Sequence, residues 1–398
     1  MDKQVSIIGT GMNGKNSVTV PALEAINNAD AVIGAKRMTT PFSDMDKPVL
    51  VSYDPAETSD FIEKTPYEKY AVLMSGDCGF FSGTEKLLPY LAGFHTEIIC
   101  GITSPVYFSS KIKIPWSDWH FISLHGTDAN IVRNIYAHEK TFFLLGGKIT
   151  PSGICRMLCE YGLDDMEIYI GENLSYDNEK ITHSCANELC DIQTTNLAVL
   201  LAVNKKYEKL KRIGIPDGEF IRSKVPMTKS EVRSVCISKL EIADNSICWD
   251  IGSGSGSVSV EMALQCTDGK VYSVDRSEDA ISLIRQNLRK FGCDNIIPVH
   301  GCAENIVHEL PAPDCVFIGG SGGHLSKIIG MAYEKNPYAV IVITAVSLET
   351  LNKSAEAFED MGISPEITQI AVTRTRKIGT HTMLTAENPI FIIKGGAK

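Results

Sequence analysis

The sequence predicts an α/β fold in two successive domains. In this chain of 398 residues, short apolar strands that end in glycine alternate with helix-like segments, which is the pattern of sheets covered by helices. The alternation forms two series, one on each side of a basic stretch at 204–213. The length also fits two domains, since one domain takes roughly 100–200 residues. We therefore expect one domain at 1–203 and another at 204–398.

The first series begins with an apolar strand and a glycine turn. A helix is expected at 19–28, because Leu23 and Ile26 are spaced for one face and Pro21 stands near its start. The other elements of this series are strands, expected at residues 5–9, 31–34, 70–74, 141–145 and 166–170.

The second series follows the basic stretch at 204–213, which is succeeded by Gly214 and Pro216. We place the domain junction in this stretch; a solvated helix face is the alternative, and either allows a linker. A helix is expected at 277–291. Strands are expected at residues 246–251, 269–275, 296–300, 314–318, 339–344 and 388–393.

Composition excludes several classes of protein. A net charge of −10 argues against broad binding to nucleic acid, which requires a basic face. No apolar run approaches the ~18 residues that a membrane-spanning helix needs. The first residues lack the features of a signal peptide, so we expect a cytoplasmic protein. The twelve cysteines form no Cys-x-x-Cys pair, and His183, Cys185 and Cys190 are poorly spaced for zinc, so no metal is expected.

The most informative stretch follows the strand at 246–251. Asp250 precedes Gly252-Ser253-Gly254-Ser255-Gly256, and glycines at this spacing allow a tight turn and close approach of a ligand to the backbone. The spacing differs from the Gly-x-Gly-x-x-Gly of dinucleotide sites. A carboxylate before the glycines suits the cationic amino-acid part of a ligand.

Two further positions complete this constellation. Asp275 ends the next strand, where a carboxylate can accept both hydroxyls of a ribose. Ala303 follows the third strand, where an adenine edge would be met. Together these residues resemble the S-adenosylmethionine site of the Rossmann-like class I methyltransferases, which makes S-adenosylmethionine the expected cofactor.

The remainder of this half resembles one methyltransferase family closely. The stretches 214–222, 226–233 (Pro-Met-Thr-Lys-Ser-Glu-Val-Arg) and 317–323 (Phe-Ile-Gly-Gly-Ser-Gly-Gly) occur in the order found in the precorrin methyltransferases of the cobalamin pathway. The resemblance implies methylation of carbon 15 of a corrin precursor and decarboxylation of its ring-C acetate. It also implies that Thr228 and the glycines of 252–256 touch the cofactor.

The first half carries a different set of motifs. Gly9-Thr-Gly11-Met-Asn-Gly14, Ser-Gly76-Asp77-Cys-Gly-Phe80 and Gly-Ile-Thr103-Ser104 occur in this order. They resemble the tetrapyrrole methylases, whose fold has two lobes with S-adenosylmethionine in the cleft between them. The resemblance implies cofactor contacts by Gly9, Gly11, Gly14, Gly76, Asp77, Phe80, Thr103 and Ser104.

This half departs from most of that superfamily at one point. Met12-Asn13-Gly14 stands where a proline is usual in the first glycine loop. The departure fits the branch that methylates carbon 5 of the same intermediate. The two halves therefore suggest consecutive reactions on one tetrapyrrole, and the resemblance implies a homo-oligomer, because relatives of both halves assemble.

The substrate of such a reaction carries many carboxylates, so its pockets should be locally basic. The candidates for binding these carboxylates are Lys36 and Arg37 in the first half and Arg222, Lys224, Lys229 and Arg233 in the second. No residue is identified as the acid that assists decarboxylation.

Three other functions remain open at this stage. The chain could methylate RNA, protein or diphthamide, or one half could bind S-adenosylmethionine without catalysis. The glycine-rich loop could also belong to a nicotinamide dehydrogenase.

Overall fold

The computed structural model describes residues 3–126, 129–208 and 211–396. It confirms the predicted α/β fold, with parallel strands in all three large sheets. The chain divides into two compact units: unit 1 comprises Met1–Thr127, Lys140–Arg156 and Asp165–Val203, and unit 2 comprises Asp128–Glu139, Met157–Asp164 and Asn204–Lys398. Unit 2 thus includes two short segments of the first half besides the residues from Asn204 onward. The domain limits at 1–203 and 204–398 stay a prediction.

Unit 1 begins with a parallel five-stranded sheet, the first sheet, in the order β3-β2-β4-β1-β5. Its strands are β1 (Gln4–Gly9), β2 (Ala31–Gly34), β3 (Val49–Val51), β4 (Lys69–Met74) and β5 (His95–Ile99). Its helices are α1 (Val20–Asn28), α2 (Lys36–Thr39), α3 (Pro55–Lys64) and α4 (Thr84–Leu87), with 3-10 turns at Gly14–Asn16, Thr40–Met45 and Leu88–Leu91.

Two hydrophobic clusters cover the two faces of this sheet. One joins Ile7 and Val72 to Ile62 of α3, and the other joins Ile8 to Ile26 of α1. The alternation of Ile7 and Ile8 between the two clusters follows from the two-residue period of a strand. The expected strands at 5–9, 31–34 and 70–74 are therefore buried on both faces.

The second sheet, also in unit 1, is mixed and has the order β6-β7-β10-β8-β9. Its strands are β6 (His120–Ser123), β7 (Lys140–Leu144), β8 (Glu167–Glu172), β9 (Lys180–Cys185) and β10 (Ala198–Val203). The neighbouring helices in the sequence are α5 (Ser104–Ile112), α6 (Ile131–Ala137) and α7 (Pro151–Glu160), with a 3-10 turn at Ala186–Leu189.

One face of the second sheet carries a buried aromatic cluster. We define this cluster by its buried members, which are Phe108, Trp119, Phe142, Leu174, Val199, Leu201 and Val203. The rings of Trp119 and Phe142 stack with their centroids 5.5 Å apart. The cluster also contacts partly buried residues of the first sheet's loops, Met12 and Phe80.

Unit 2 contains a seven-stranded sheet, the third sheet, in the order β13-β12-β11-β14-β15-β19-β16. The first five strands are parallel, whereas β19 runs antiparallel to β15 and β16 runs antiparallel to β19. The strands are β11 (Ile247–Ile251), β12 (Lys270–Asp275), β13 (Ile296–His300), β14 (Cys315–Ile318), β15 (Val340–Ala345), β16 (Glu366–Ile370) and β19 (Ile390–Gly395). The strand order reverses between β11 and β14, which is the switch point where open α/β sheets bind ligands.

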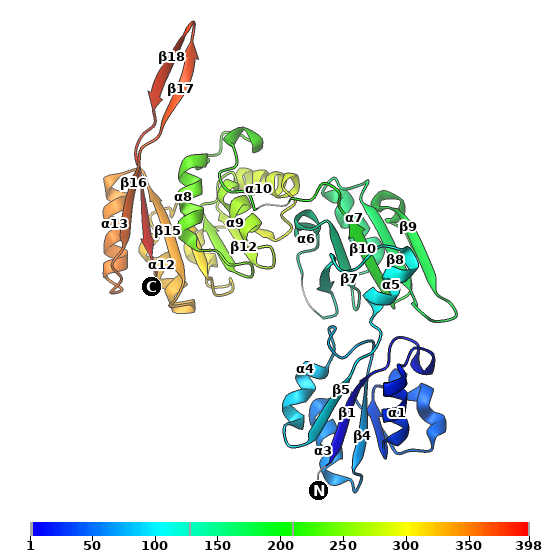
Figure 1. Cartoon of the computed structure of the whole chain (residues 1–398). Coiled ribbons are helices and arrows are strands. Elements are labelled where there is room, and N and C mark those ends of the chain that lie inside the picture. The colour runs from blue at the N-terminus through cyan, green and yellow to red at the C-terminus, as the bar shows by residue number, and fades with distance from the viewer. Residues whose placement is uncertain (1–2, 127–128, 209–210, 397–398) are drawn as a thin grey trace. The chain divides into compact units, whose positions relative to one another are not determined.

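Helices cover both faces of the third sheet, as Figure 1 illustrates. One cluster packs α8, α9 and α10 on one face, and a second packs α12 and α13 on the other. These helices are α8 (Ser230–Leu240), α9 (Ser257–Gln265), α10 (Glu278–Lys290), α12 (Leu325–Lys335) and α13 (Leu348–Glu359), with α11 (Ala303–Ile306) and a 3-10 turn at Asp217–Glu219.

A two-stranded hairpin, which the sequence analysis did not predict, extends from the third sheet. It consists of β17 (Thr373–Ile378) and β18 (His381–Ala386), and Figure 1 shows it in red, projecting away from the helices. Its side chains are largely exposed, including those of Ile378 and Leu384.

Helix α6 is held inside unit 2 by buried polar contacts. The Asp294 carboxylate accepts hydrogen bonds from the amides of Val132 and Arg133, each at 2.8 Å, and thereby caps the start of the helix. The side-chain amide of Asn130 donates to the carbonyls of Thr267 and Gly269, both at 2.8 Å. A capping carboxylate satisfies amides that a helix leaves unpaired, so this segment is fixed by residues more than a hundred positions away.

The expected domain junction at 204–213 includes residues 209 and 210, which lie outside the described residues. The described part of that stretch is irregular rather than helical. Within the described residues, no helix combines the length and apolar character that crossing a membrane requires.

Candidate functional site

The glycine loop of unit 2 lies at the carboxyl end of β11, where the strand order reverses. Gly252, Gly254 and Gly256 have φ angles of 70°, 55° and 74°, which side-chain-bearing residues rarely adopt. A Cβ atom on Gly252 would lie 2.5 Å from the Gly320 carbonyl oxygen, and one on Gly254 would lie 2.6 Å from the Pro226 carbonyl oxygen. Both the backbone angles and the lack of space therefore demand glycine.

Asp275 connects this loop to the next strand. One carboxylate oxygen accepts the Gly254 amide at 2.9 Å, and the other accepts the Ser277 amide at 2.9 Å. The Asp275 carbonyl accepts the amide of Gly301 at 2.9 Å. Each carboxylate oxygen has a second lone pair, so Asp275 retains acceptor capacity for a ligand. The structure thus brings together the glycine loop, Asp275 and the turn that leads to Ala303.

Two serines of the loop are held from the protein side. The Ser253 hydroxyl lies 2.9 Å from the Asp250 carbonyl and 2.9 Å from the Val274 carbonyl, and either carbonyl can accept its hydrogen bond. The carbonyl of Ser255 accepts the side-chain amide of Asn287 at 2.9 Å, and Asn287 is fully buried on α10. Asn287 was not predicted, since nothing in its local sequence shows that α10 packs against the loop.

Asp250 lies beneath the loop with no exposed surface. One of its oxygens accepts a short hydrogen bond from Ser259, whose hydroxyl also pairs with Ser273 at 2.6 Å. Its other oxygen has no hydrogen-bond partner among the described residues. Burial raises the pKa of Asp250 to about 7. The carboxylate is therefore not presented to a ligand, and we correct its expected role from direct contact with the cofactor to a buried contact between β11 and Ser259 of α9.

Arg233 is a second correction, because it is buried and fully engaged. Its guanidinium binds Glu261 at 2.5 Å and the Thr228 carbonyl at 2.5 Å, and it also donates to the Ile215 carbonyl. Asp217 lies 3.4 Å from the same group. Arg233 and Glu261 are both 0% exposed. The prediction that Arg233 binds substrate carboxylates is wrong; it anchors the segment before α8.

The other basic candidates of this half are more accessible. Arg222 and Lys224 are exposed, and the Lys229 amine lies 3.8 Å from the Asp217 carboxylate. Arg374 of the hairpin was not predicted; it forms an ion pair with Glu231 and lowers the pKa of that carboxyl group to about 2. Sequence separation hides this contact, since the two residues are 143 positions apart.

In unit 1 the glycine loop after β1 is held by two other loops. The backbones of Gly11 and Gly76 form an antiparallel bridge with hydrogen bonds of 3.0 and 2.7 Å. The Asp77 carboxylate accepts the Gly101 amide at 3.0 Å. A Cβ atom on Gly9 would lie 2.7 Å from the Gly101 nitrogen. The three predicted motifs therefore meet at the carboxyl end of the first sheet.

The remaining candidates of unit 1 lie around this meeting point. A Cβ atom on Gly76 would lie 3.7 Å from the Thr103 hydroxyl, and Ser104 begins α5 directly after it. Gly14 adopts φ 47° against Pro41. Phe80 instead packs edge-on against Phe121 in the aromatic cluster, with centroids 5.4 Å apart.

Lys36 and Arg37 lie on α2 with exposed side chains. Arg37 donates to the Ser75 hydroxyl at 2.9 Å, directly before Gly76. Its guanidinium is therefore adjacent to the glycine loops, where a substrate carboxylate could meet it.

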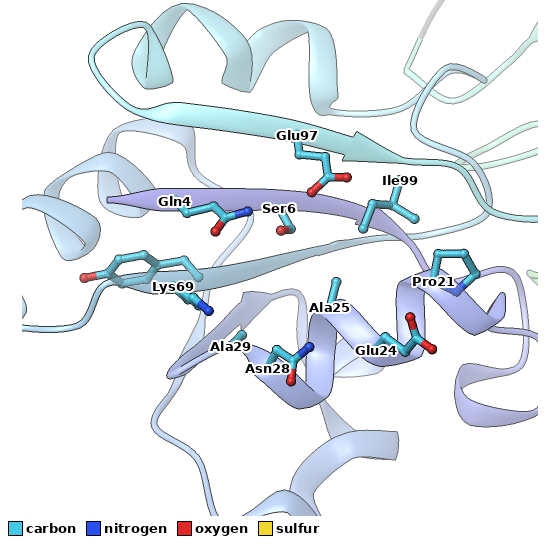
Figure 2. Close-up of a pocket in the computed structure, with 11 residues that line it drawn as sticks. Gln4, Ser6, Pro21, Glu24, Ala25, Asn28, Ala29, Lys69, Glu97 and Ile99 are labelled. Atoms are coloured by element: carbon cyan, nitrogen blue, oxygen red, sulfur yellow. The ribbon is translucent and has the colours of Figure 1, made fainter. Parts of the chain in front are cut away.

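A cavity of about 300 Å³ lies elsewhere in unit 1, between α1 and the strands β1 and β5. Figure 2 shows Glu24 of α1 and Glu97 of β5 among its lining residues, with Gln4 and Ser6 on β1. It contains no residue of the predicted sites. In the described part of the chain, no group of three or more His, Cys, Asp or Glu side chains is arranged to hold a metal ion.

Comparisons with known proteins match the two halves separately. The family model of the tetrapyrrole (corrin/porphyrin) methylases matches residues 4–190, and that of the precorrin methyltransferase domain matches residues 219–394. A probable cobalt-precorrin-6B C(15)-methyltransferase (decarboxylating) of Pyrobaculum calidifontis is 45% identical over 183 residues, which are 45% of this chain and 94% of that protein.

Two further similarities are of the same kind. The corresponding protein of Saccharolobus solfataricus is 40% identical over 188 residues, which are 46% of this chain and 94% of that protein. A crystal structure described as precorrin-6y C5,15-methyltransferase from Geobacter metallireducens has 40% identity and a TM-score of 0.45, and the match covers 47% of this chain and 97% of that one.

Proposed function

Because the chain belongs to the family of the cobalt-precorrin-6B C(15)-methyltransferases (decarboxylating), we propose that it is a bifunctional enzyme of cobalamin biosynthesis. It uses S-adenosylmethionine to methylate a precorrin-6-type tetrapyrrole at carbons 5 and 15, and it removes the ring-C acetate as carbon dioxide. Unit 1 carries out the carbon-5 reaction with a two-lobed tetrapyrrole methylase fold. Unit 2 carries out the carbon-15 reaction with a Rossmann-like class I methyltransferase fold.

One observation supports this proposal above the others: the chain has two glycine loops, each at the carboxyl end of a parallel strand in a different sheet. The loop at 252–256 lies at the switch point of the third sheet and is joined to Asp275. The loop at 9–14 meets the motifs of Gly76 and Gly101. Two separate sites support two methyl transfers, as the two family matches also do.

The residues of unit 2 fit S-adenosylmethionine. Glycine at 252 and 254 lets the backbone pack without a Cβ atom, and the remaining acceptor capacity of Asp275 suits ribose hydroxyls. When bound, the cofactor supplies a methyl group that its positive sulfur already activates. The chain's task is then to hold the acceptor carbon in line with that methyl group and to exclude water.

Decarboxylation requires a different contribution from the protein. The bond to the departing carbon dioxide leaves its electron pair on the substrate, and the conjugated ring accepts that pair. The protein promotes this step by holding the acetate where its charge is poorly solvated. For the other carboxylates of the substrate we propose Lys36 and Arg37 in unit 1, and Arg222, Lys224 and Lys229 in unit 2.

Mass spectrometry of the product tests this function. The full chain is incubated with isotopically labelled S-adenosylmethionine and a precorrin-6B-type tetrapyrrole, with and without cobalt. We expect a gain of two labelled methyl groups and a loss of carbon dioxide, and the preferred form of the substrate identifies whether cobalt is already present.

Other outcomes would contradict the bifunctional assignment. A gain of one methyl group would mean that one half is a non-catalytic module. No reaction with either substrate would return the assignment to a methyltransferase acting on RNA or protein. The predicted homo-oligomer, the absence of nucleic-acid and membrane partners and the cytoplasmic location stay predictions.

A further inference from the structure

Met12 and Asn13 of the first glycine loop both reach the second sheet's side of unit 1. The side-chain amide of Asn13 donates to the Ser175 carbonyl at 2.5 Å, across 162 positions of sequence. Met12 packs against the aromatic cluster. The glycine loop is therefore in contact with residues 173–179, which follow β8.

The segment 173–179 has a demanding backbone conformation. Asn173 and Ser175 have φ angles of 47° and 70°, in the left-handed region that residues other than glycine rarely adopt. Such residues persist where surrounding contacts hold them, and they concentrate at functional sites. Leu174, between them, is buried in the aromatic cluster.

Specific contacts hold this conformation. The Glu179 carboxylate accepts the Ser175 amide at 2.7 Å and pairs with the Lys111 amine at 2.8 Å. The Asn173 amide donates to the Leu197 carbonyl at 2.9 Å. Partial burial raises the pKa of Glu179, but the hydrogen bonds from Lys111 and from the Ser175 amide outweigh it and hold the pKa below its ordinary value. The carboxylate therefore stays charged at neutral pH.

Asn13 is also fixed on the side of the glycine loop. Its backbone amide donates to the Ser17 hydroxyl at 2.7 Å, and that hydroxyl donates to the Thr10 carbonyl at 3.0 Å. The loop around Gly11 is thus braced within itself by Ser17 and from outside by Ser175. The Ser175 hydroxyl is buried and has no partner within the described ranges, so the Ser175 carbonyl is the group of this residue that holds the loop.

We propose that Asn13 is a positioning residue for the cofactor site of unit 1. Its side-chain amide ties the glycine loop to the Ser175 carbonyl, so that the loop has its binding conformation before S-adenosylmethionine arrives. This inference rests on the proposed function of unit 1. A loop that is ordered in advance loses less entropy on binding, so the contact should favour cofactor affinity rather than the chemical step.

The test compares Asn13→Asp with Asn16→Asp in the full chain. Asn13→Asp keeps the shape of the side chain, removes the donor and places a carboxylate opposite the Ser175 carbonyl. Asn16→Asp makes the same change of charge at an exposed position of the same loop. Both are made in a background with Gly254→Val, which blocks the loop of unit 2, so that calorimetric titration with S-adenosylmethionine reports the site of unit 1 alone.

We expect Asn13→Asp to weaken cofactor binding about tenfold, the effect of about 1.4 kcal/mol, and Asn16→Asp to leave it unchanged. Asn13→Gln, which keeps the donor on a longer side chain, should recover part of the affinity. Glu179→Gln should weaken binding in the same direction, because it loosens Ser175. Without the Gly254 substitution, Asn13→Asp should raise the KM for S-adenosylmethionine in carbon-5 methylation while leaving kcat within about twofold and the carbon-15 reaction unaffected.

The inference would be overturned if the Asn13→Asp chain bound S-adenosylmethionine as tightly as the chain that keeps Asn13. It would also be overturned if Asn13→Asp and Asn16→Asp lost the same amount of affinity. A lower kcat with unchanged KM would also contradict it. Failure of the proposed function is read separately: it would appear as missing methylation of carbon 5 by the unaltered chain, whereas the titration depends only on cofactor binding.

Discussion

The glycine loops of the two units are held by different means. In unit 1 the loop after β1 is fixed by other loops, through the backbone bridge between Gly11 and Gly76 and the side chain of Asn13. In unit 2 the loop after β11 is held by side chains of the neighbouring strand and helix, because Asp275 accepts the Gly254 amide and the buried Asn287 donates to the Ser255 carbonyl. The glycine loop is thus held by contacts between loops in unit 1, and by side chains of the adjacent strand and helix in unit 2.

This difference indicates which kind of substitution should impair each site. Buried charges are costly to leave unpaired, so unit 2 should lose stability when its interior is altered. Loop contacts near the surface of unit 1 contribute less to folding and more to the shape of the site. Substitutions in the two units should therefore separate loss of stability from loss of binding.

The largest effect is expected from Arg233→Met, which leaves Glu261 buried without its cation. Breaking a buried ion pair in this way costs about 3–5 kcal/mol, so unit 2 should unfold at clearly lower urea concentration. The double variant Arg233→Met with Glu261→Gln should recover part of the loss, because no charge remains at position 261, whereas its single amide oxygen can accept only one of the Gly214 and Ile215 amides that Glu261 binds. If the single variant were as stable as the unaltered chain, the buried pair would not support unit 2.

A matched pair of glycine substitutions compares the two loops directly. Gly254→Ala and Gly11→Ala each place a Cβ atom at a residue with positive φ, 55° and 68° respectively, within 2.6 Å of an oxygen. Because a left-handed conformation costs such a residue roughly 1–2 kcal/mol, each should weaken its own site about tenfold or more. Product masses should show Gly254→Ala impaired at carbon 15 and Gly11→Ala impaired at carbon 5. Impairment of both methylations by either variant would show that the sites are not separate.

Asp294→Ala should loosen α6 without affecting either glycine loop. It removes the acceptor of the Val132 and Arg133 amides, and loss of a helix cap costs about 1–2 kcal/mol. Hydrogen exchange should become faster over residues 131–137. Asp294→Asn retains one oxygen acceptor and should show a smaller increase; equal protection in all three proteins would argue against the cap.

The smallest expected effect concerns the pH dependence of Asp250. Burial raises its pKa from the ordinary value of 3.8 to about 7 in the folded chain, so the folded state holds a proton that the unfolded state releases. The stability of unit 2 should therefore fall as pH rises between these two values. Asp250→Asn removes this titration and should gain stability over the unaltered chain, on the order of 1 kcal/mol at about pH 8 and less at about pH 5. A difference that shrinks with rising pH would contradict this.

The parts of the fold that the sequence predicted are those with a local pattern. Short apolar runs identified β1, β2 and β4 of the first sheet and every strand of the third sheet except β16, and Asp275 was identified by its place at the end of a strand. The strands β3, β5 and β16 were not predicted, because their residues are largely exposed. The hairpin at 373–386 was not predicted, because its exposed strands have no apolar pattern directed toward a core. Local pattern therefore marks elements that pack against the body of a unit.

The candidate site residues show the same limit. Arg233 was wrongly assigned to the substrate, because a sequence shows a charge but not its burial against Glu261. Asn287, Arg374 and Ser175 were not predicted to act at a site, since each acts on a residue many positions away. Their roles depend on how helices and loops pack, which no spacing in the sequence records.

We propose that one chain holds two separate sites for S-adenosylmethionine. Calorimetric titration of the full chain with S-adenosylmethionine tests it most directly, because the number of molecules bound does not depend on a supply of tetrapyrrole. We predict two molecules bound per chain, falling to one when either Gly11 or Gly254 is replaced by valine. Binding of only one molecule of S-adenosylmethionine by the unaltered chain would contradict the proposal of two sites.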